Sequence, residues 1–479
     1  MPSDLLQSVA SSLWSIVLVI LFLGGSIFVH ELGHFLAARR RGMRVERFSI
    51  GFGPKIFAWR GRDGVEYRVS WLPLGGYVIL PQLTGVPMVE CEAEIEASRL
   101  PPVGYGTRML VLAAGAMFNV LFAFVLACIV WRVGLPTSTD LDTTKIGLVV
   151  STITLPDRTT VPSPASEAGL QPGDIVRAID GRRITDWPDL QQTLYMGSGR
   201  TADGRPRAVF TIERAGRTFD VAVYPRRTGD DGLRTVGIAQ AEEFIVAEVK
   251  SGSPAAQAGL MPGDRIVALD GRTVLNSSVL FGSLRRNPDQ PVALAVLRAD
   301  RPLVLTLPPR PRTPNGADLG IAFRKGFKLL HPDPFSQLAD DAAMTFRMLA
   351  ALVNPRSDVS VSDLSGPVGI ASAFYAAAQT DIRLVLWFAI LVNVSFAILN
   401  LLPIPVFDGG HMLFATIGRL RGRSLPPEFV MIVQSVFVVL IISLFAYVTL
   451  FDVRRISRDN RAEPAPPPAA PAGAEPAAP

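Results

Sequence analysis

The sequence is poor in the residues that build disulfide frameworks and cysteine metal sites. Only two of its 479 residues are cysteines, Cys91 and Cys128, and they lie far apart. Two distant cysteines supply neither a disulfide framework nor a cysteine metal site. Histidine is almost as scarce, with four copies. Basic residues form no stripe interleaved with aromatic side chains, which argues against a nucleic acid as partner.

Charged residues make up 19% of the chain, yet four long apolar runs contain none. The runs are Leu5–Val29, Met109–Trp131, Leu384–Phe407 and Phe429–Phe451. Each is long enough to span a bilayer as a helix. No small-residue cleavage site follows the first run, so we interpret it as a membrane anchor and not as a removed signal peptide. The pattern predicts a polytopic α-helical membrane protein with four transmembrane helices.

The distribution of arginine predicts the orientation of these helices, because loops rich in Lys and Arg stay in the cytoplasm. Arginines cluster between residues 39 and 44 and again between 419 and 423. Both loops are therefore expected on the cytoplasmic side, and the segment from 133 to 383 on the outer side. Arginines between 454 and 461 disagree with this orientation, so the side of the C-terminal tail stays open.

The first apolar run leads directly into His30-Glu31-Leu32-Gly33-His34. Residues four apart share one face of a helix, so His30 and His34 can bind the same metal ion. Glu31 lies beside them and can act as a general base towards water. A chance motif that binds no metal is the alternative. Ionisable side chains at membrane depth are costly, which favours the functional interpretation.

A catalytic zinc ion needs a third protein ligand. Pro403 and Pro405 are expected to end the third transmembrane helix, and Gly409-Gly410 to form a sharp turn. Asp408 then lies on irregular backbone at the inner edge of the membrane, where it is the preferred third ligand. His411, just beyond the two glycines, is the alternative.

The segment between the second and third runs contains an internal repeat. Ser163–Asp174 recurs as Ser253–Asp264, and each copy carries the pattern Ala-Gly-Leu-x-Pro-Gly-Asp. An apolar strand and an Asp-Gly-Arg turn follow each copy. The pattern resembles the tandem PDZ domains of bacterial proteases, which we place at 146–241 and 243–324. Such domains bind peptides at a sheet edge; an equally weighted alternative is a steric filter with empty grooves.

The metal motif, the segment Asn400–Gly410 and the repeated insert together resemble the site-2 protease family (peptidase M50), especially its bacterial regulator-of-sigma-E branch. The resemblance implies an intramembrane zinc metalloprotease, with zinc held by His30, His34 and Asp408 and with Glu31 as the catalytic base. It implies cleavage in the transmembrane segment of single-span membrane proteins. Anti-sigma factors already shortened by another protease, and remnant signal peptides, are the expected substrate classes.

The same resemblance carries further expectations. Asn400 matches a family asparagine that holds the substrate backbone. The segment from 65 to 80 matches a membrane re-entrant β-hairpin, whose Leu-Gly-Gly-Tyr turn contains Gly75 and Gly76 and lies at the substrate. Ser365–Ile370 matches a motif that precedes the third span. The protein is expected in the bacterial inner membrane, where it contacts lipids. Its PDZ domains are expected in the periplasm.

The predicted fold combines transmembrane helices, a re-entrant hairpin and two PDZ domains, which are α+β domains made mainly of strands. An amphipathic surface helix is expected at 334–354, with packing against the soluble domains as the alternative. The remaining predicted segments are transmembrane helix 1 at 5–38, a cytoplasmic loop with the re-entrant hairpin at 39–107, transmembrane helix 2 at 108–132, transmembrane helix 3 at 384–410, transmembrane helix 4 at 429–451 and a disordered Ala/Pro tail at 463–479.

Two other classes of protein were weighed. A membrane scaffold with PDZ domains and an inactive protease core would not need the intact motif residues. A serine protease of the HtrA type also joins PDZ domains to a membrane anchor, but the sequence has no Gly-x-Ser-x-Gly.

Overall fold

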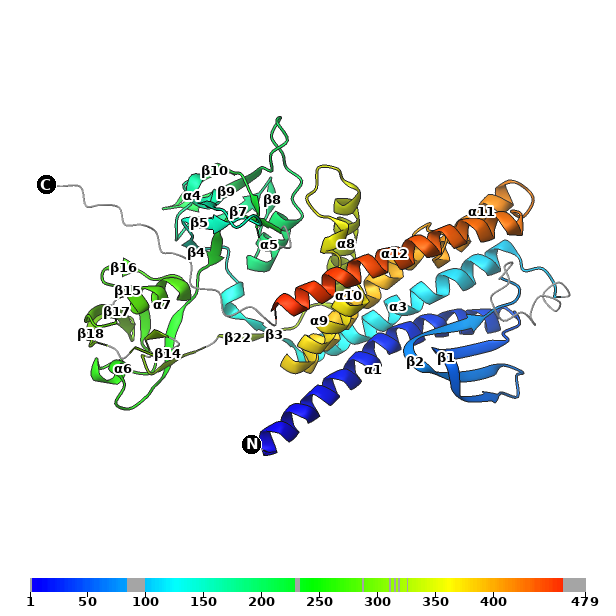
Figure 1. Ribbon diagram of the computed structural model, residues 1–479, viewed down its shortest axis with the longest axis horizontal. Helices are drawn as coiled ribbons and strands as arrows, with labels where there is room; N and C mark the ends of the chain where they lie inside the picture. Colours follow the sequence, from blue (N-terminus) through cyan, green and yellow to red (C-terminus); the bar gives the residue numbers. More distant parts are fainter. Residues whose placement is uncertain are drawn as a thin grey trace. The chain divides into compact units, whose positions relative to one another are not determined.

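The computed structural model describes residues 2–83, 100–228, 233–286, 288–309, 312–313, 316–317, 319–324 and 326–459. These residues form two compact units (Figure 1). The first unit contains residues 1–136, 329–347 and 364–460, and the second contains 137–328 and 348–363. Cys91 and the Ala/Pro tail at 463–479 lie outside the described residues.

Helices dominate the first unit. Its elements are α1 (Pro2–Arg40), β1 (Arg47–Arg60), β2 (Glu66–Ile79), α3 (Tyr105–Val133), α8 (Pro334–Val353, which continues into the second unit), α9 (Pro367–Thr380), α10 (Ile382–Leu401), α11 (Asp408–Leu420) and α12 (Pro427–Asp459). Within the described part of the chain, four helices are long and apolar enough to cross a membrane. They are Ser12–Arg40, Tyr105–Val133, Ile382–Leu401 and Pro427–Ser457, which confirms the four predicted spans.

The third span is shorter than predicted. Helix α10 ends at Leu401, and Leu402 has the extended backbone of a C-cap. Pro403 explains the stop, because the residue before a proline is pushed out of the helical region and proline cannot donate a helix hydrogen bond. The helix thus ends just before Pro403, as expected from the two prolines, and residues 402–407 of the predicted segment 384–410 are not helical.

Helix α3 lies beside both α1 and α10 (Figure 1). Small residues on α3 make the close contact possible: Ala123 and Ala127 are fully buried in a cluster that also contains Leu18 of α1 and Ile390 of α10. Burying small side chains lets helix backbones approach, which drives association in a membrane better than bulk hydrophobicity does.

Helix α12 is joined to α9 by a buried carboxylate. Asp452 is 1% exposed, and its Oδ2 accepts hydrogen bonds from the backbone N–H groups of Gly366 and Gly369 at 2.9 and 2.8 Å. A Cβ at Gly369 would lie 2.6 Å from Asp452 Oδ1. Because the glycines of the Ser365–Ile370 motif have no side chains, the carboxylate can reach the first N–H groups of α9. Negative charge is favoured at this end of a helix by the unpaired N–H groups and by the helix dipole.

Helix α8 packs on the transmembrane helices. Its residues Leu338 and Ala342 contact the core cluster that α3 and α10 share, and Thr345 Oγ1 lies 3.0 Å from Ser395 Oγ of α10. Neither sequence-based alternative, a helix on the membrane surface or one packed on the soluble domains, included this contact.

The predicted hairpin region forms a small antiparallel sheet. Each strand is bent, so that residue Phe48 of β1 pairs with both Tyr67 and Val78 of β2. The segment predicted as a Leu-Gly-Gly-Tyr turn lies inside β2. It joins the two halves of that strand, both of which pair with residues 47–50 of β1. Large apolar residues of this sheet are exposed: Phe52, Ile56, Phe57, Trp59 and Trp71.

The second unit contains two copies of one α/β arrangement. The first copy comprises β4 (Ile146–Val149), β5 (Thr152–Thr154), β6 (Thr160–Pro162), α4 (Pro164–Glu167), β7 (Ile175–Ile179), β8 (Arg182–Arg183), α5 (Trp187–Tyr195), β9 (Ala208–Arg214), β10 (Arg217–Val223) and β13 (Ile238–Gln240). The second comprises β14 (Phe244–Val249), α6 (Pro254–Gln257), β15 (Arg265–Leu269), β16 (Arg272–Thr273), α7 (Ser277–Arg286), β17 (Val292–Arg298), β18 (Arg301–Leu307) and β21 (Ile321–Phe323).

The two copies share strand order and core. The order β10-β9-β7-β8 recurs as β18-β17-β15-β16. Buried Leu170, Ile179 and Leu190 have counterparts in Leu260, Leu269 and Leu280, each 90 positions later. Short strands β11 (Arg226–Thr228), β12 (Leu233–Thr235), β19 (Arg312–Thr313) and β20 (Gly316–Ala317), the pair β3 (Leu135–Ser138) and β22 (Phe327–Leu330), and two single 3-10 turns (Thr139–Leu141 and Val361–Asp363) complete the described elements.

The repeated Asp-Gly sequence forms a tight turn in both copies. Asp180 and Gly181 have φ of 48° and 79°, and Asp270 and Gly271 have φ of 47° and 74°. Two consecutive positive φ values define a type I′ hairpin turn, which favours Asp followed by Gly. The repeated Asp-Gly signal therefore reflects the same backbone requirement in each copy.

The aspartate that ends each repeat is buried and paired with an arginine. Asp264 is fully enclosed and accepts two hydrogen bonds from Arg298, at 2.7 Å each, and one from the backbone of Met261 at 2.8 Å. Asp174 and Arg214 form the same arrangement in the first copy, at 2.6 and 2.7 Å. A bidentate guanidinium satisfies both carboxylate oxygens. The conserved spacing of the repeat thus encodes a buried ion pair.

This ion pair gives the second copy an acid-sensitive stability. The Arg298 guanidinium holds the pKa of Asp264 below its ordinary value. Because the pKa is lower in the folded than in the unfolded state, the stabilisation is complete above the unfolded value of about 3.9 and is lost as the pH falls through the folded value. We expect Asp264→Asn to lower the free energy of unfolding by about 3 kcal/mol at neutral pH, and by less in acid.

Hydrogen exchange of β15 and β17 in the full chain measures this loss. Asp300→Asn is the matched control, because the Asp300 side chain is 96% exposed and lies 4.0 Å from its nearest cation. Equal protection in the two variants would contradict a stabilising role for the buried pair.

Candidate metal centre

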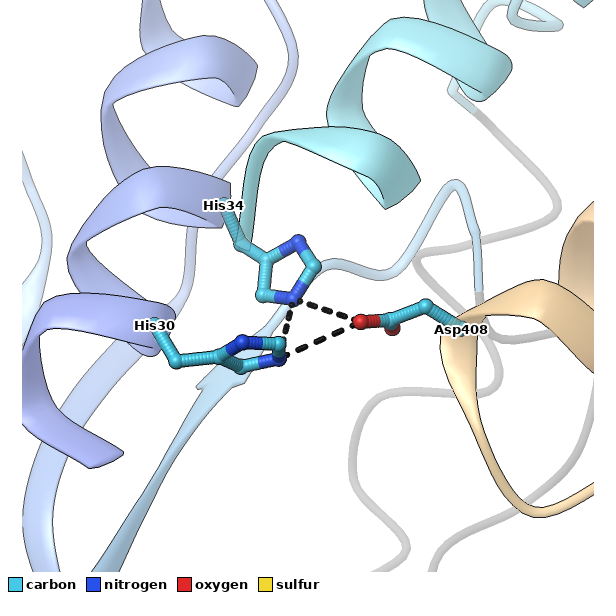
Figure 2. A group of neighbouring side chains, drawn as sticks. All are labelled: His30, His34 and Asp408. Atoms are coloured by element: carbon cyan, nitrogen blue, oxygen red, sulfur yellow. Dashed lines mark hydrogen bonds and ion pairs between the residues drawn. The ribbon is translucent and has the colours of Figure 1, made fainter. Parts of the chain in front are cut away.

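The two motif histidines face each other from successive turns of α1. His30 Nε2 and His34 Nε2 lie 3.1 Å apart, and the ring planes are nearly perpendicular. Figure 2 shows both imidazoles directed away from α1 toward the same point. The four-residue spacing on a helix produces this arrangement, because the side chains lie one turn apart on one face. Two nitrogen lone pairs are thereby available to one cation.

Helix α3 positions both imidazoles. His34 Nδ1 lies 2.8 Å from the backbone oxygen of Val111, to which it donates, and this leaves Nε2 free for a metal. Gly115 lies one turn further along α3, beneath the two rings. A Cβ at Gly115 would overlap His34 Nε2 and lie 2.7 Å from His30 Cε1. Only glycine leaves room for both rings at this position.

Asp408 completes the group from the far end of the chain. Its Oδ2 lies 3.2 Å from His30 Nε2 and 3.3 Å from His34 Nε2 (Figure 2). Asp408 is the first residue of α11, not part of an irregular turn as predicted. Gly409 and Gly410 are helical and buried, and a Cβ on either would overlap a carbonyl oxygen of the segment after α10. The two glycines therefore allow close packing of the α10–α11 break.

The three donor atoms fit a zinc ion. They form a nearly equilateral triangle with edges of 3.1, 3.2 and 3.3 Å. Tetrahedral zinc with bonds of about 2.0 Å places its ligands about 3.3 Å apart. Two imidazoles and one carboxylate are also the donor types that zinc takes in catalytic sites, with a fourth position open. Within the described chain, this is the group of His, Cys, Asp and Glu side chains that can hold a metal.

Glu31 lies between the metal ligands and the small sheet. A Cβ at Gly76 would lie 3.3 Å from Glu31 Cγ, so the Glu31 side chain lies against β2. The segment of β2 from 76 to 79 pairs with β1 on one side only. A strand edge and a carboxylate thus border the same metal site.

The other predicted residues occupy different surroundings. His411 Nε2 contacts Gln434 of α12 at 3.3 Å and does not belong to the metal group. Asn400 lies in the last turn of α10 and is partly exposed. Gly75 is buried, and a Cβ there would overlap the ring of Phe52.

Comparison with known proteins assigns this architecture to a family. The family model for Peptidase family M50 matches residues 18–444. The chain belongs to peptidase family M50. It is 32% identical to the regulator of sigma E protease of Salmonella typhi over 458 residues, which covers 91% of this chain and 98% of the relative.

Two further relatives have similar coverage. Identity to the regulator of sigma-E protease RseP of Escherichia coli (strain K12) is 32% over 460 residues, 91% of this chain and 98% of the relative. A Treponema pallidum protein whose name includes zinc metalloprotease is 33% identical over 445 residues, 88% of this chain and 94% of the relative. The protein is therefore a membrane-embedded metalloprotease of family M50.

Sequence reasoning missed the contribution of α3 to this M50 site. Val111 and Gly115 bear directly on the histidines, yet both lie in an apolar run where they carry no chemical signal. The one signal at this position is a glycine inside a helix. Glycine lowers the stability of a helix, and a close contact with another element is the usual reason for it.

Gly115→Ala tests the role of α3. The new methyl group would displace the imidazoles, and we expect the affinity for zinc to fall about 10- to 100-fold, as when a supporting contact of a metal ligand is lost. Metal content after dialysis against a chelator measures the change. Gly106→Ala, in the same helix, is the matched control because no atom lies within 4 Å of a Cβ there. Equal metal content in both variants would show that Gly115 does not set the imidazole geometry.

Proposed function

We propose that this M50 peptidase hydrolyses peptide bonds within the transmembrane segment of single-span membrane proteins, a reaction of regulated intramembrane proteolysis. One observation carries the proposal: three metal-donor atoms and an adjacent carboxylate converge among helices apolar enough to span a bilayer. Ionisable groups at such depth are retained for function because they are costly.

We assign zinc to His30, His34 and Asp408, in keeping with the zinc metalloprotease name of the relative in Treponema pallidum. When bound, zinc supplies Lewis acidity that polarises a peptide carbonyl and acidifies water. The Val111 carbonyl fixes the His34 tautomer so that Nε2 keeps its lone pair.

Glu31 is assigned the proton transfers. It follows a metal ligand directly in the chain, and its carboxylate can accept a proton from water and return it to the leaving nitrogen. Its side chain lies against Gly76, at the sheet edge where the scissile bond would lie. Base and substrate edge are thereby positioned together.

The substrate is proposed to bind as an added strand. A transmembrane helix hides its carbonyls in internal hydrogen bonds, so the cleaved segment must unwind first. The outer edge of residues 76–79 offers backbone groups to an extended chain. Gly76 lets β2 pass close to Glu31. Gly75 and Asn400, the latter in the last turn of α10, are assigned contacts with the substrate backbone. The exposed apolar residues of the sheet suit a re-entrant position in the membrane.

The names of the relatives support a proposed substrate class. Two of them are named regulators of sigma E, which makes an anti-sigma factor or a remnant signal peptide the proposed type of substrate, with prior shortening by another protease as a further expectation. The proposed location is the bacterial inner membrane, and the arginine clusters support an orientation with the repeated domains in the periplasm. The repeated domains, which resemble PDZ domains, are proposed either to bind peptides or to exclude bulky substrates.

An inactive membrane scaffold remains the alternative function. It predicts no stoichiometric metal, because a scaffold has no use for a triangle of donor atoms. The tight spacing at His30, His34 and Asp408 favours the enzyme.

Glu31→Gln tests the assignment of the base. The amide keeps the size of the side chain but cannot accept the proton, so we expect hydrolysis of a single-span substrate to slow about 100- to 10,000-fold. Zinc content is expected to stay unchanged because Glu31 is not a ligand. Glu66→Gln, in the same small sheet, is the control, since Glu66 pairs with Arg47. Full activity of Glu31→Gln protein would refute the role.

Asp408→Ala and His411→Ala distinguish the two candidates for the third ligand. Removing the Asp408 carboxylate leaves two ligands, so zinc should be lost during purification. His411→Ala should retain zinc, because its ring contacts Gln434. Metal analysis of the two proteins decides the matter, and the reverse pattern would move the third ligand to His411.

A further inference from the structure

A buried asparagine on α3 has no role in the reaction so far described. Asn119 is 0% exposed, and neither atom of its amide has a hydrogen-bond partner among the described residues. Leaving a buried donor or acceptor unpaired costs about 1–3 kcal/mol. Such a cost in the middle of a membrane helix calls for a ligand that pairs with the amide.

Asn119 lies one helix turn from the metal centre. Helices α1 and α3 run antiparallel in contact: His34 meets Val111, and one turn away His30 meets Gly115. If the same pairing is continued by one more turn on both helices, Ser26 of α1 lies at the level of Asn119. The asparagine therefore follows Val111 and Gly115 on the face of α3 that supports the histidines.

Two other helices place buried polar groups at this level. Ser26 is 0% exposed and donates to the Phe22 backbone oxygen at 2.7 Å. It accepts a hydrogen bond of 2.8 Å from Asn393 Nδ2 of α10, which is 0% exposed and also donates to Ala389 O at 2.8 Å. The Asn393 Oδ1 atom is buried without a partner in the described chain. We name Ser26, Asn119 and Asn393 the polar layer.

One metal-ligand histidine, one helix turn from the polar layer, has an unsatisfied nitrogen. His34 Nδ1 is paired with Val111 O, but His30 Nδ1 is buried and meets no hydrogen-bond acceptor among the described residues. Side chains on a helix lean over the preceding turn, so the ring of His30 lies over the turn that carries Ser26. A histidine that ligates a metal almost always donates its other N–H, which fixes the ring.

We propose that the polar layer holds an internal water molecule that accepts the hydrogen bond of His30 Nδ1, with the Asn119 amide and Asn393 Oδ1 as its other partners. This inference rests on the proposed role of His30 as a zinc ligand. Buried waters typically make two to four hydrogen bonds to otherwise unpaired groups, and about three such groups are present here. Asn119 is then a positioning residue, which acts on zinc through the water and His30.

The role of Asn119 makes opposite predictions for stability and for metal binding. Asn119→Leu removes both amide atoms at similar volume. Because an unpaired amide and its water are replaced by an apolar side chain, the metal-free protein should unfold at the same or a higher temperature. His30 should lose its fixed orientation, so the zinc dissociation constant should rise about 10- to 100-fold.

The experiment compares full-length variants purified in detergent by three measurements: chelator competition for zinc, the visible spectrum of the cobalt(II)-substituted protein, and thermal unfolding without metal. Asn119→Ser should restore zinc affinity to within a few-fold and the wild-type spectrum, since a hydroxyl can hold the water. Met117→Leu is the control because Met117 is 61% exposed on the other side of α3. If Asn119→Leu does not fold, Asn119→Ala carries the same prediction for zinc affinity and spectrum.

Wild-type zinc affinity and an unchanged cobalt spectrum in Asn119→Leu would overturn the inference. A loss of zinc affinity that Asn119→Ser fails to restore, with equal loss of metal-free stability, would overturn it as well, because the asparagine would then be a packing residue. Failure of the proposed function is distinguishable: wild-type protein would bind no zinc at all, whereas failure of this inference alone leaves wild-type zinc binding intact.

Discussion

The close approach of α1 and α3 is the contact on which the catalytic geometry depends. A glycine from each helix permits it: a Cβ at Gly33 would overlap the Ala114 backbone oxygen, and a Cβ at Gly115 would overlap the imidazole of His34. Because the backbones touch, a carbonyl of α3 reaches His34 Nδ1 and fixes the ring. Small residues at a membrane helix interface normally supply packing energy. Here they also orient the two histidines, one turn apart on α1, so that both can bind one metal ion.

The break between α10 and α11 supplies the second constraint. A carboxylate on a continuous transmembrane helix would point sideways, whereas Asp408 opens a new helix whose first glycines lie against the carbonyls left over from the old one. Negative charge is favoured at a helix start. The prolines, the aspartate and the two glycines of this segment therefore act together, and each has a separate physical task in bringing one oxygen to within 3.3 Å of both imidazoles.

Local signals predicted the spans, the histidine pair and the repeat, because each depends on spacing within a short segment. The four spans were predicted from charge-free runs, and the repeat from the recurring Ala-Gly-Leu-x-Pro-Gly-Asp pattern and the turn after it, in which Asp180 and Asp270 have positive φ. The role of Gly115 and the double pairing of Phe48 could not be predicted, since both depend on which distant segments meet. The turn expected at Gly409 was wrong for a different reason. Glycine pairs mark turns and close packing alike, and the sequence does not distinguish these uses.

Buried polar groups are used in two opposite ways in this protein. In the repeated domains, Asp264 has every oxygen paired with a guanidinium or a backbone amide, so its burial stabilises the fold. In the membrane unit, His30 Nδ1 and both amide atoms of Asn119 lie at or one turn from the metal ligands and have no hydrogen-bond partner in the described part of the chain. A fully paired group is rigid and inert, whereas an unpaired one retains the capacity to bind something else. The paired carboxylates of Asp264 and Asp452 therefore stabilise the fold, whereas the unpaired groups near His30 lie where the proposed zinc ion and water would bind.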